Sequence, residues 1–540
     1  MRGTGETITS EETMLSDGVV NALDRAIEQK LATRISERDA SVWTNDPNVQ
    51  KIVEDRLGWL GVPDWTLTHL KEIADFVEAV CKECITTVVV LGMGGSSLCV
   101  EVLRDTFGSK HGYPTLLVLD STHPDQILDV ERACDLAKTL FIVSSKSGTT
   151  LEPQCYFDYF WNKLESMGSD RGSRFAAITD PGTPLEKMGD ELEFRHVFAN
   201  PPDIGGRYSV LSYFGMVPAA LAGIDIEELL SRAGSEASLA RSEDERNVPL
   251  AFGIFLGHGV QRGRDKLTIV ASPELRSFGY WAEQLLAEST GKNGKGILPV
   301  EGESPTAILE EAEHRLYAHL TFGEAALSDE DRLKPNHIEL HLRDCSELGA
   351  QFFRWEFATA VAGQMMGINP FDEPNVAESK AKTNEVLASY RPDTPLLFKE
   401  GAGGGFTAEA LDKFLSANVK RDGYIAIMAY LNRNEASKAA LASLREKLSL
   451  KYHVPVTVGF GPSFLHSTGQ FHKGGPATGT FVQFVDTPRE DIPIPGKPYT
   501  FGTLIRAQAI GDFETLKKHG RPVVSFDLGN DPMAAIARIA

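Results

Sequence analysis

Residues 140–152 read LFIVSSKSGTTLE, and this strand and the polar turn after it are the most informative stretch of the chain. Leu140 to Val143 form an apolar strand that runs directly into hydroxyl groups, a lysine and a glycine. Hydroxyls and backbone N–H groups at a strand-to-helix turn lie at the positive end of the helix dipole, where a phosphate is stabilised without a large basic patch. By itself the run also fits an ordinary turn of serines and threonines that caps a helix.

A second turn of this kind lies upstream, in the segment TVVVLGMGGSSL at 87–98. It lacks the third glycine of the dinucleotide fingerprint, because that position is Ser97, and it has no P-loop ending. It offers a backbone that can approach a ligand closely at Gly94 and Gly95, with the hydroxyl of Ser96 at a helix start.

Strands and helices alternate from residue 87 in the manner of βαβ units. We expect strands at 87–91, 115–119, 139–143 and 174–178, with helices at 97–107, 124–136 and 152–167. This alternation predicts a doubly wound parallel sheet of the α/β class. A strand at 266–271 starts a second lobe. Later strands are expected at 424–430, 455–459 and 480–485, before a helix at 501–518. These later elements either complete the second sheet or form a third lobe.

The predicted organisation has four parts. They are an N-terminal helical segment at 1–80, a first doubly wound domain with the phosphate turn at 81–245, a second at 246–400, and a C-terminal α/β part at 401–540. The first part is predicted to be helical because its apolar residues recur at near-helical spacing.

Composition excludes several classes of partner. The net charge of −21 argues against nucleic acid and anionic membranes, since both need a basic protein surface. The first residues lack the apolar core of a signal peptide, and no apolar run approaches the length of a membrane span. We therefore expect a cytoplasmic protein, and its six scattered cysteines do not indicate a disulfide framework.

Two residues between and within the lobes are candidates for catalysis. Arg207 follows a glycine turn in GGRYS at 205–209, where a fixed guanidinium could stabilise a developing oxyanion. Glu288 ends an apolar helix, and burial there would raise the pKa of its carboxyl and suit it to abstract a proton next to a carbonyl. Each residue also has a non-catalytic explanation. Arg207 could form a structural ion pair with a carboxylate, and Glu288 could be an ordinary solvated glutamate.

Two later segments carry further candidates. In NPFDEPNVAESK at 369–380, a helix opening after Pro374 would place Glu373 and Lys380 about two turns apart on one face, and a surface salt bridge is the alternative. In FLHSTGQFHKGGP at 464–476, His466 is a candidate acid/base group. The two histidines of this loop make a poor ligand set for zinc, so we expect no metal site.

Five motifs stand together in the order of the glucose-6-phosphate isomerase (phosphoglucose isomerase) family, namely 92–98, 145–152, 205–209, 288–292 and 369–380. The chain resembles this family over about residues 60–390, which implies a pair of sugar-isomerase (SIS) domains. The segment 420–540 resembles the isomerase part of bacterial transaldolase–glucose-6-phosphate isomerase fusions.

The resemblance implies roles for residues of the first domain. Hydroxyl groups would hold the sugar phosphate, and they belong to Ser96, Ser145, Ser147 and Thr150. Lys146 and Glu152 would border the site, and Gly95 would bring backbone close to the sugar.

The resemblance also implies the chemistry. Glu288 would carry a proton between C2 and C1 through a cis-enediolate, and Arg207 would stabilise its negative charge. Lys380 and a histidine would open the sugar ring as general acid and base. Neither a metal nor a redox cofactor is needed, and a homodimer is expected. The reaction would interconvert glucose 6-phosphate and fructose 6-phosphate in either direction.

The chain departs from the family pattern at two points. The string around His466 follows Lys380 here, whereas in many bacterial relatives it precedes the Asn-Pro-Phe-Asp segment. His466 would reach the site through the fold or from a neighbouring subunit, and His314 and His319 are its competitors. Where many relatives carry glutamine, this chain has Glu373, whose carboxylate should face the sugar hydroxyls or Lys380.

Two other functions stay open. One is a bifunctional isomerase that also accepts mannose 6-phosphate. The other is a non-catalytic SIS-domain sensor of sugar phosphates, which predicts a DNA-binding or partner segment. This acidic chain shows no basic helix-turn-helix pattern.

Overall fold

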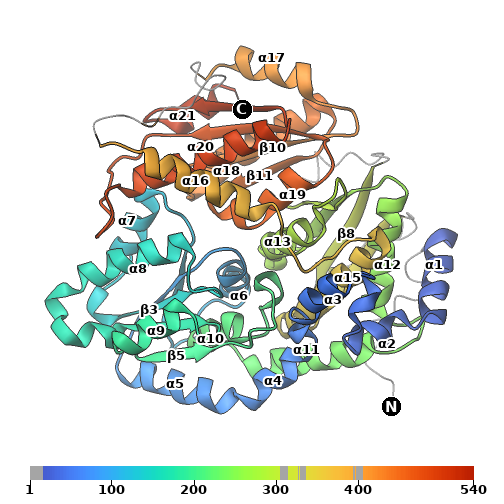
Figure 1. Cartoon of the computed structure of the whole chain (residues 1–540), viewed down its shortest axis with the longest axis horizontal. Helices are drawn as coiled ribbons and strands as arrows, with labels where there is room; N and C mark the ends of the chain where they lie inside the picture. Colours follow the sequence, from blue (N-terminus) through green and yellow to red (C-terminus); the bar gives the residue numbers. More distant parts are fainter. Residues whose placement is uncertain are drawn as a thin grey trace.

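The part of the chain that the structure describes is organised by three separate parallel β-sheets, each flanked by helices (Figure 1). The computed structural model describes residues 16–303, 314–325, 328, 336–392, 396 and 406–539. Within this part the α/β class predicted from the strand and helix alternation is confirmed, because every pairing between the named strands is parallel.

The first sheet has the strand order β2-β1-β3-β4-β5. Its strands are β1 (Thr87–Leu91), β2 (Thr115–Leu119), β3 (Thr139–Ser144), β4 (Phe175–Thr179) and β5 (His196–Ala199). The helices between them are α6 (Leu98–Phe107), α7 (Pro124–Arg132), α8 (Leu151–Lys163) and α9 (Pro184–Glu191). Strand β1 lies beside β3 with Leu91 opposite Val143, so the two polar turns that follow these strands lie at the same edge of the sheet.

Two helices of this lobe end earlier than predicted. Helix α7 stops at Arg132 instead of 136, and a short 3-10 turn capped by Asp135 follows it. Helix α8 stops at Lys163 instead of 167, and the 3-10 segment after it is broken at Gly168, whose φ of 62° does not continue a right-handed helix. The apolar periodicity alone did not register these capping turns.

The second sheet has the order β7-β6-β8-β9. Its strands are β6 (Lys266–Ala271), β7 (Leu298–Val300), β8 (Arg315–Phe322) and β9 (His337–Leu342). The helices of this lobe include α12 (Val248–Gln261), α13 (Phe278–Thr290) and α15 (Leu348–Met366). Every residue of α13 except Tyr280 is buried, and the helix carries Glu288 in its last turn.

The C-terminal residues form a third sheet of their own, with the order β11-β10-β12-β13. Its strands are β10 (Tyr424–Tyr430), β11 (Val456–Phe460), β12 (Gly479–Val485) and β13 (Val523–Asp527). Its helices are α17 (Ala408–Asn418), α18 (Glu435–Tyr452), α19 (Thr468–Gly474), α20 (Phe501–Lys518) and α21 (Pro532–Ala537). The sheet does not extend the second one, and the predicted boundary at 400 and 401 lies outside the described residues.

Helices at the N-terminus and between the lobes complete the fold. Those at the N-terminus are α1 (Asp17–Glu28), α2 (Leu31–Ser36), α3 (Pro47–Glu54), α4 (Val62–Thr68) and α5 (Leu70–Lys82). The connecting helices are α10 (Tyr213–Leu221), α11 (Ile226–Ala240) and α16 (Val376–Ser389). Helix α16 packs along α20, so it ties the second lobe to the third (Figure 1).

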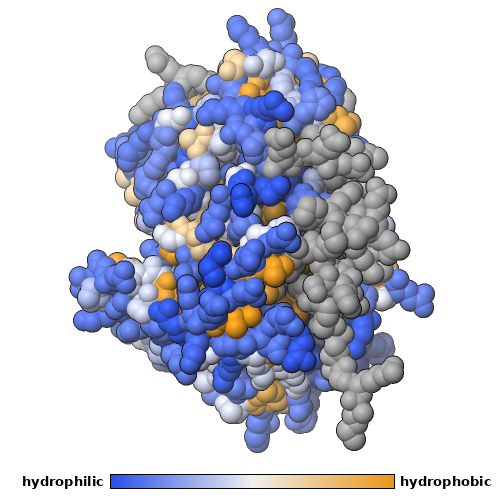
Figure 2. All heavy atoms as spheres, turned by 90° about the vertical axis from the view of Figure 1, so that its right-hand side faces the viewer, coloured by the Kyte–Doolittle hydropathy of each residue, from blue (hydrophilic) through white to orange (hydrophobic). Residues whose placement is uncertain are grey.

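The face of the molecule drawn in Figure 2 is mostly hydrophilic, with hydrophobic residues in small separate patches. Among the described helices, none combines the length and the apolar character that crossing a bilayer requires.

Candidate active site

A cavity of about 410 Å³ gathers residues from all three lobes. Most of the candidate residues line it, and these are Gly95, Ser96, Lys146, Ser147, Thr150, Arg207, Glu288, Glu373, Lys380 and His466. A smaller cavity of about 170 Å³ shares several of these walls and is also lined by Glu152. Ser145 lines neither cavity, and it lies behind Thr150, to which its hydroxyl donates a hydrogen bond of 3.0 Å.

The serine and threonine turn between β3 and α8 forms one wall. Thr150 is the N-cap of α8, but its side chain makes no capping hydrogen bond. The hydroxyls of Ser147 and Thr149 lie 3.0 Å apart. Gly148 has a φ of 63°, and a Cβ there would lie 2.9 Å from the backbone N of Leu185, so the tight turn requires glycine. The turn presents hydroxyls at the positive end of a 13-residue helix.

Lys146 borders the cavity without supplying a free positive charge. Its ammonium forms an ion pair with Asp180 and also donates to the Pro202 carbonyl at 2.9 Å. Asp180 itself lines the cavity. The charge of the lysine is therefore balanced within the protein, and anion binding at this turn depends on the hydroxyls and the helix end.

A close contact between two glycines brings the first lobe and the arginine turn together. A Cβ on Gly95 would lie only 2.0 Å from the carbonyl oxygen of Gly206, so no larger residue fits. Gly206 begins the short 3-10 turn that carries Arg207. The approach of these backbones sets the guanidinium against the cavity.

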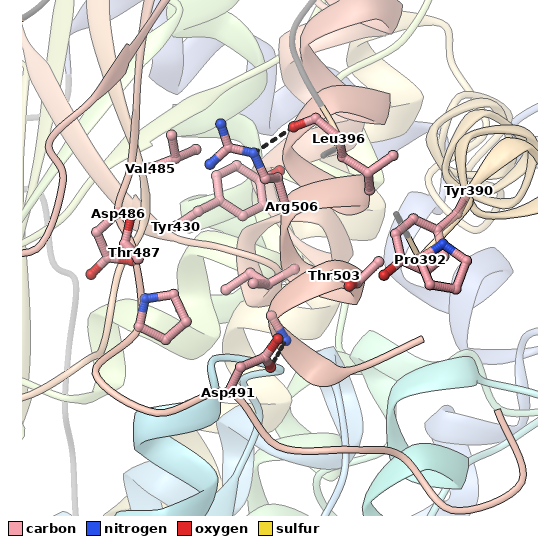
Figure 3. A pocket seen from close by; sticks show the side chains of 13 residues that line it. Tyr390, Pro392, Leu396, Tyr430, Val485, Asp486, Thr487, Asp491, Thr503 and Arg506 are labelled. Atoms are coloured by element: carbon pink, nitrogen blue, oxygen red, sulfur yellow. Dashed lines mark hydrogen bonds between the residues drawn. The ribbon is translucent and has the colours of Figure 1, made fainter. Parts of the chain in front are cut away.

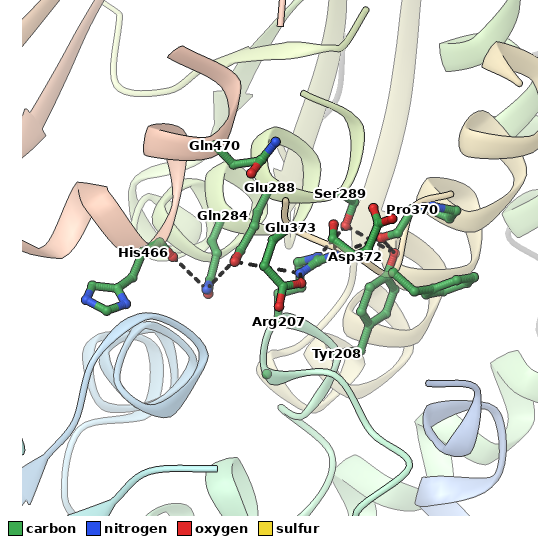
Figure 4. Close-up of polar contacts among 12 residues, drawn as sticks. Arg207, Tyr208, Gln284, Glu288, Ser289, Pro370, Asp372, Glu373, His466 and Gln470 are labelled. Atoms are coloured by element: carbon green, nitrogen blue, oxygen red, sulfur yellow. Dashed lines mark hydrogen bonds and ion pairs between the residues drawn. The ribbon is translucent and has the colours of Figure 1, made fainter. Parts of the chain in front are cut away.

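Arg207 lies between two carboxylates (Figure 4). Its Nη1 is 2.9 Å from Glu373 Oε2 and 3.7 Å from Glu288 Oε1. Its Nε donates to the Ser289 hydroxyl at 2.7 Å, and its Nη2 donates to the Pro370 carbonyl at 2.9 Å. The side chain is only 3% exposed, so the planar cation is held in one orientation beside the cavity.

Glu288 ends a buried helix, as the sequence predicts. Its Oε2 accepts a hydrogen bond of 3.0 Å from Gln284, one turn earlier on α13, and Gln284 also donates to the backbone carbonyl of His466 at 2.8 Å (Figure 4). Burial raises the pKa of the Glu288 carboxyl, against the lowering effect of the Arg207 guanidinium. A raised pKa brings a carboxylate closer to the range of a useful general base.

The segment from Asn369 to Lys380 differs from the prediction in one respect. Helix α16 begins at Val376, so Glu373 lies in the preceding turn and does not share a helix face with Lys380. Glu373 pairs with Arg207 rather than with Lys380. The turn is held by Lys292, whose ammonium donates to the Asn369 carbonyl at 2.8 Å and to Asp372. The predicted placement of Glu373 and Lys380 on one helix face is therefore wrong, because the contacts of Lys292 and Arg207 hold Glu373 in a turn before the helix.

Lys380 lines both cavities from the first turns of α16. Among the described residues its ammonium makes no hydrogen bond or ion pair that would neutralise it. It is therefore a cation available to a ligand, unlike Lys146.

His466 reaches the cavity from the same chain, through the loop that follows β11. Its Nε2 lies 3.3 Å from Glu152 Oε1, and the same carboxylate oxygen accepts a hydrogen bond of 2.8 Å from Gln508 on α20. Gln508 Oε1 accepts a hydrogen bond of 2.7 Å from the Thr122 hydroxyl. This buried chain of contacts runs from the first lobe through the third and ends at the imidazole.

A family model described as "Phosphoglucose isomerase" matches residues 66–298. Over these residues the chain is similar to the phosphoglucose isomerase family. The matched range includes Arg207 and Glu288 and ends before Lys380 and His466.

Named relatives of the phosphoglucose isomerase family extend this match. A probable glucose-6-phosphate isomerase of Methanococcus maripaludis is 29% identical over 64% of this chain and 87% of its own length. A glucose-6-phosphate isomerase of Staphylococcus saprophyticus is 28% identical over 62% of this chain and 87% of its own length. The likeness of residues 420–540 to transaldolase fusions stays a prediction.

Solved structures share the fold. A hypothetical protein from Thermus thermophilus superimposes with a TM-score of 0.60 at 25% identity, over 70% of this chain and 99% of its own. A glucose-6-phosphate isomerase from Chlamydia trachomatis gives a TM-score of 0.56 at 20% identity, over 71% of this chain and 88% of its own.

The two competing histidines lie away from the phosphoglucose isomerase motifs. The ring of His314 is 3.1 Å from the Gly263 carbonyl, and the ring of His319 is 2.9 Å from His337 on the neighbouring strand. Neither lines the cavities described above. Within the described ranges no group of three or more histidine, cysteine or acidic residues is arranged to hold a metal ion.

Two glutamines of the site were not predicted. Gln284 carried a usable signal, because it precedes Glu288 by four residues on a helix, where side chains one turn apart meet. Gln508 carried none, since it is 356 residues from the carboxylate that it contacts.

Proposed function

We propose that this chain is a glucose-6-phosphate isomerase, which interconverts glucose 6-phosphate and fructose 6-phosphate through a cis-enediolate. The single observation that carries the proposal is the buried Glu288 carboxylate 3.7 Å from the Arg207 guanidinium, beside a hydroxyl-lined turn. The named relatives in the same family support this substrate pair.

The sugar phosphate binds at the turn between β3 and α8. The hydroxyls of Ser96, Ser147 and Thr150 donate to it, while Ser145 orients Thr150 from behind. The positive end of α8 and the ammonium of Lys380 compensate the phosphate charge.

Ring opening uses the two groups on the other side of the phosphate turn. His466 and Lys380 move a proton between the ring oxygen and the C1 hydroxyl of glucose 6-phosphate, or the C2 hydroxyl of fructose 6-phosphate. Glu152 accepts from the imidazole and supports its protonated form.

Isomerisation follows in the open chain. The Glu288 carboxylate removes the proton from C2, and the electron pair of that C–H bond forms the C1–C2 double bond of the enediolate. The Arg207 guanidinium stabilises the negative charge on the oxygens. A proton passes from the C2 hydroxyl to the C1 oxygen within the enediolate. Protonated Glu288 then returns its proton to C1 as the C2 carbonyl forms, which yields open-chain fructose 6-phosphate.

The test is conversion of glucose 6-phosphate by purified protein in EDTA. We expect Glu288→Gln to lower kcat by about 10²–10⁴-fold because the amide cannot accept the C2 proton. Burial raises the pKa of Glu288, so wild-type kcat should fall as the pH drops through a value above the 4.5 of an ordinary glutamate.

Glu283→Gln is the matched control, because Glu283 is a buried glutamate on the same helix that does not line the cavity. Full activity in Glu288→Gln would overturn the assigned base. Binding of fructose 6-phosphate without turnover by wild type would instead favour the sensor function.

Mannose 6-phosphate differs from the glucose substrate only at C2, and turnover of it would make the enzyme bifunctional. We keep this as the alternative. Proton removal by Glu288 would act on both sugars only if the site can present either face of C2 to its carboxylate. The homodimer implied by the resemblance also stays a prediction.

A further inference from the structure

Another cavity, of about 480 Å³, lies in the third lobe and shares no lining residue with the two cavities of the candidate active site (Figure 3). It lies at the carboxyl ends of β10 and β12, where Tyr430 and Val485 are the last residues of their strands. The first turns of α20 and the end of α16 close it through Thr503 and Tyr390.

The position has a topological reason. In the order β11-β10-β12-β13, the connections from β10 and from β12 lead to opposite sides of the sheet. The crevice between these two strands is the switch point at which doubly wound sheets bind ligands.

The charged groups around the cavity are already paired. Arg506 donates to Asp527 Oδ2 at 3.1 Å and to the Leu396 carbonyl at 2.8 Å. Asp486 Oδ1 lies 3.0 Å from the His123 ring, and Asp491 accepts from the Gly502 amide at the start of α20 at 2.8 Å. Because a carboxylate caps the helix end, a phosphate would meet repulsion there.

One uncharged group, the Tyr430 hydroxyl, is not satisfied in this way, whereas the Thr503 hydroxyl lies 2.9 Å from that of Thr500. Tyr430 is 2% exposed, lines the cavity, and its hydroxyl has no hydrogen-bond partner among the described residues. A buried hydroxyl without a partner destabilises the free protein, so a ligand group that pairs with it gains affinity. The other walls are the Tyr390 ring and apolar side chains, namely Pro392, Leu396, Val485, Pro488 and Ile505.

We propose that this cavity binds an uncharged nucleoside. A flat base fits the tyrosine ring and the apolar walls, and the sugar hydroxyls suit the hydroxyls of Tyr430 and Thr503 and the carboxylate of Asp486. The site is separate from the isomerase cavity, so the proposal does not depend on the proposed reaction.

The experiment is calorimetric titration of the full chain with adenosine, AMP and glucose, in saturating fructose 6-phosphate. We expect saturable adenosine binding, a weaker response to AMP and none to glucose. Tyr430→Phe should raise the Kd for adenosine about five- to tenfold. Thr503→Trp, which fills the cavity from its rim, should abolish adenosine binding.

Tyr424→Phe is the matched control. Tyr424 lies on the same strand, is equally buried and also has an unpaired hydroxyl in the described structure, but it does not line the cavity. Its substitution should leave adenosine affinity unchanged.

Four results would overturn the proposal. They are no adenosine binding, binding of AMP as tight as that of adenosine, displacement of adenosine by fructose 6-phosphate, and binding that Tyr430→Phe and Thr503→Trp leave unchanged. Melting temperatures of the variants establish that each is folded.

Discussion

At the scale of single residues, the imidazole of His466 is positioned by a chain of neighbouring side chains. Glu152 Oε1 faces its Nε2 at 3.3 Å, so the neutral ring carries its proton on that nitrogen. Gln508 occupies the same carboxylate oxygen and is fixed from its far side by Thr122. Gln508 is thus a positioning residue, because it acts on the histidine only through Glu152.

We predict that Gln508→Leu lowers kcat about tenfold with little change in KM, because Glu152 loses a charge-assisted hydrogen bond and the imidazole loses its fixed orientation. The pH profile of kcat should shift as well, which simple loss of packing would not cause. Steady-state kinetics between pH 5 and 9 test this.

Gln483→Leu is the control for this variant, since Gln483 is a buried glutamine of the third lobe whose side-chain amide donates to the Ala509 backbone carbonyl at 3.0 Å. If Gln508→Leu leaves the pH profile of kcat unchanged, Gln508 does not position His466.

At the scale of elements, helix α13 carries two buried glutamates in different surroundings. Glu288 faces the cavity, whereas Glu283 packs against the third lobe, with its carboxylate 3.4 Å from the Ser467 hydroxyl. Burial, together with the charge of Glu301, raises the pKa of Glu283 to about 8. The contact between α13 and the His466 loop therefore contains a carboxyl that holds its proton at neutral pH.

This contact predicts that stability depends on pH. The pKa of this carboxyl is raised from 4.5 to about 8 in the folded state, so its contribution to the free energy of unfolding is fully present below pH 4.5. That contribution is lost as the pH rises through 8. We expect wild type to lose about 2 kcal/mol or more of unfolding free energy between pH 5 and 8.5 from this group. Glu283→Gln, which stays neutral, should flatten that fall.

Urea unfolding at a series of pH values measures the effect, with the exposed Glu435→Gln as control. Equal slopes for wild type and Glu283→Gln would show that Glu283 does not retain its proton.

At the scale of the whole molecule, one chain supplies all of the proposed acid and base groups. The first lobe provides the hydroxyl-lined turn, α13 of the second lobe provides Glu288, and the third lobe provides His466. From the sequence, His466 could reach the cavity either within its own chain or from a neighbouring subunit. In this structure it lines the cavity of its own chain.

A mixing experiment tests this arrangement. Glu288→Gln and His466→Ala are each expected to be nearly inactive, and co-expressed together they should remain so, because no combination of subunits rebuilds a site that lies within one chain. Recovery of a quarter or more of wild-type activity would instead mean that His466 acts across a subunit interface. Wild type co-expressed with Glu288→Gln is the control for mixed assembly.

The local order of this protein could be predicted from its sequence. Strand and helix alternation gave the parallel α/β class, since strands buried by helices on both faces read as apolar runs such as 87–91 and 139–143. Polar turns at strand ends pointed to the hydroxyl-lined wall of the cavity, and the apolar helix before Glu288 pointed to its burial, because these signals lie within one turn of each residue.

Contacts between distant segments were decided only by the tertiary structure. Contact of the third lobe with the first brought His466 to Glu152 and set Gln508 beside a carboxylate 356 residues away. His314 and His319 lie outside the cavities that His466 lines. The pairing of Glu373 with Arg207, and of Lys146 with Asp180, followed in the same way. Local pattern does not encode such contacts, since they depend on how finished lobes fit together in space and on which charges burial leaves in need of a partner.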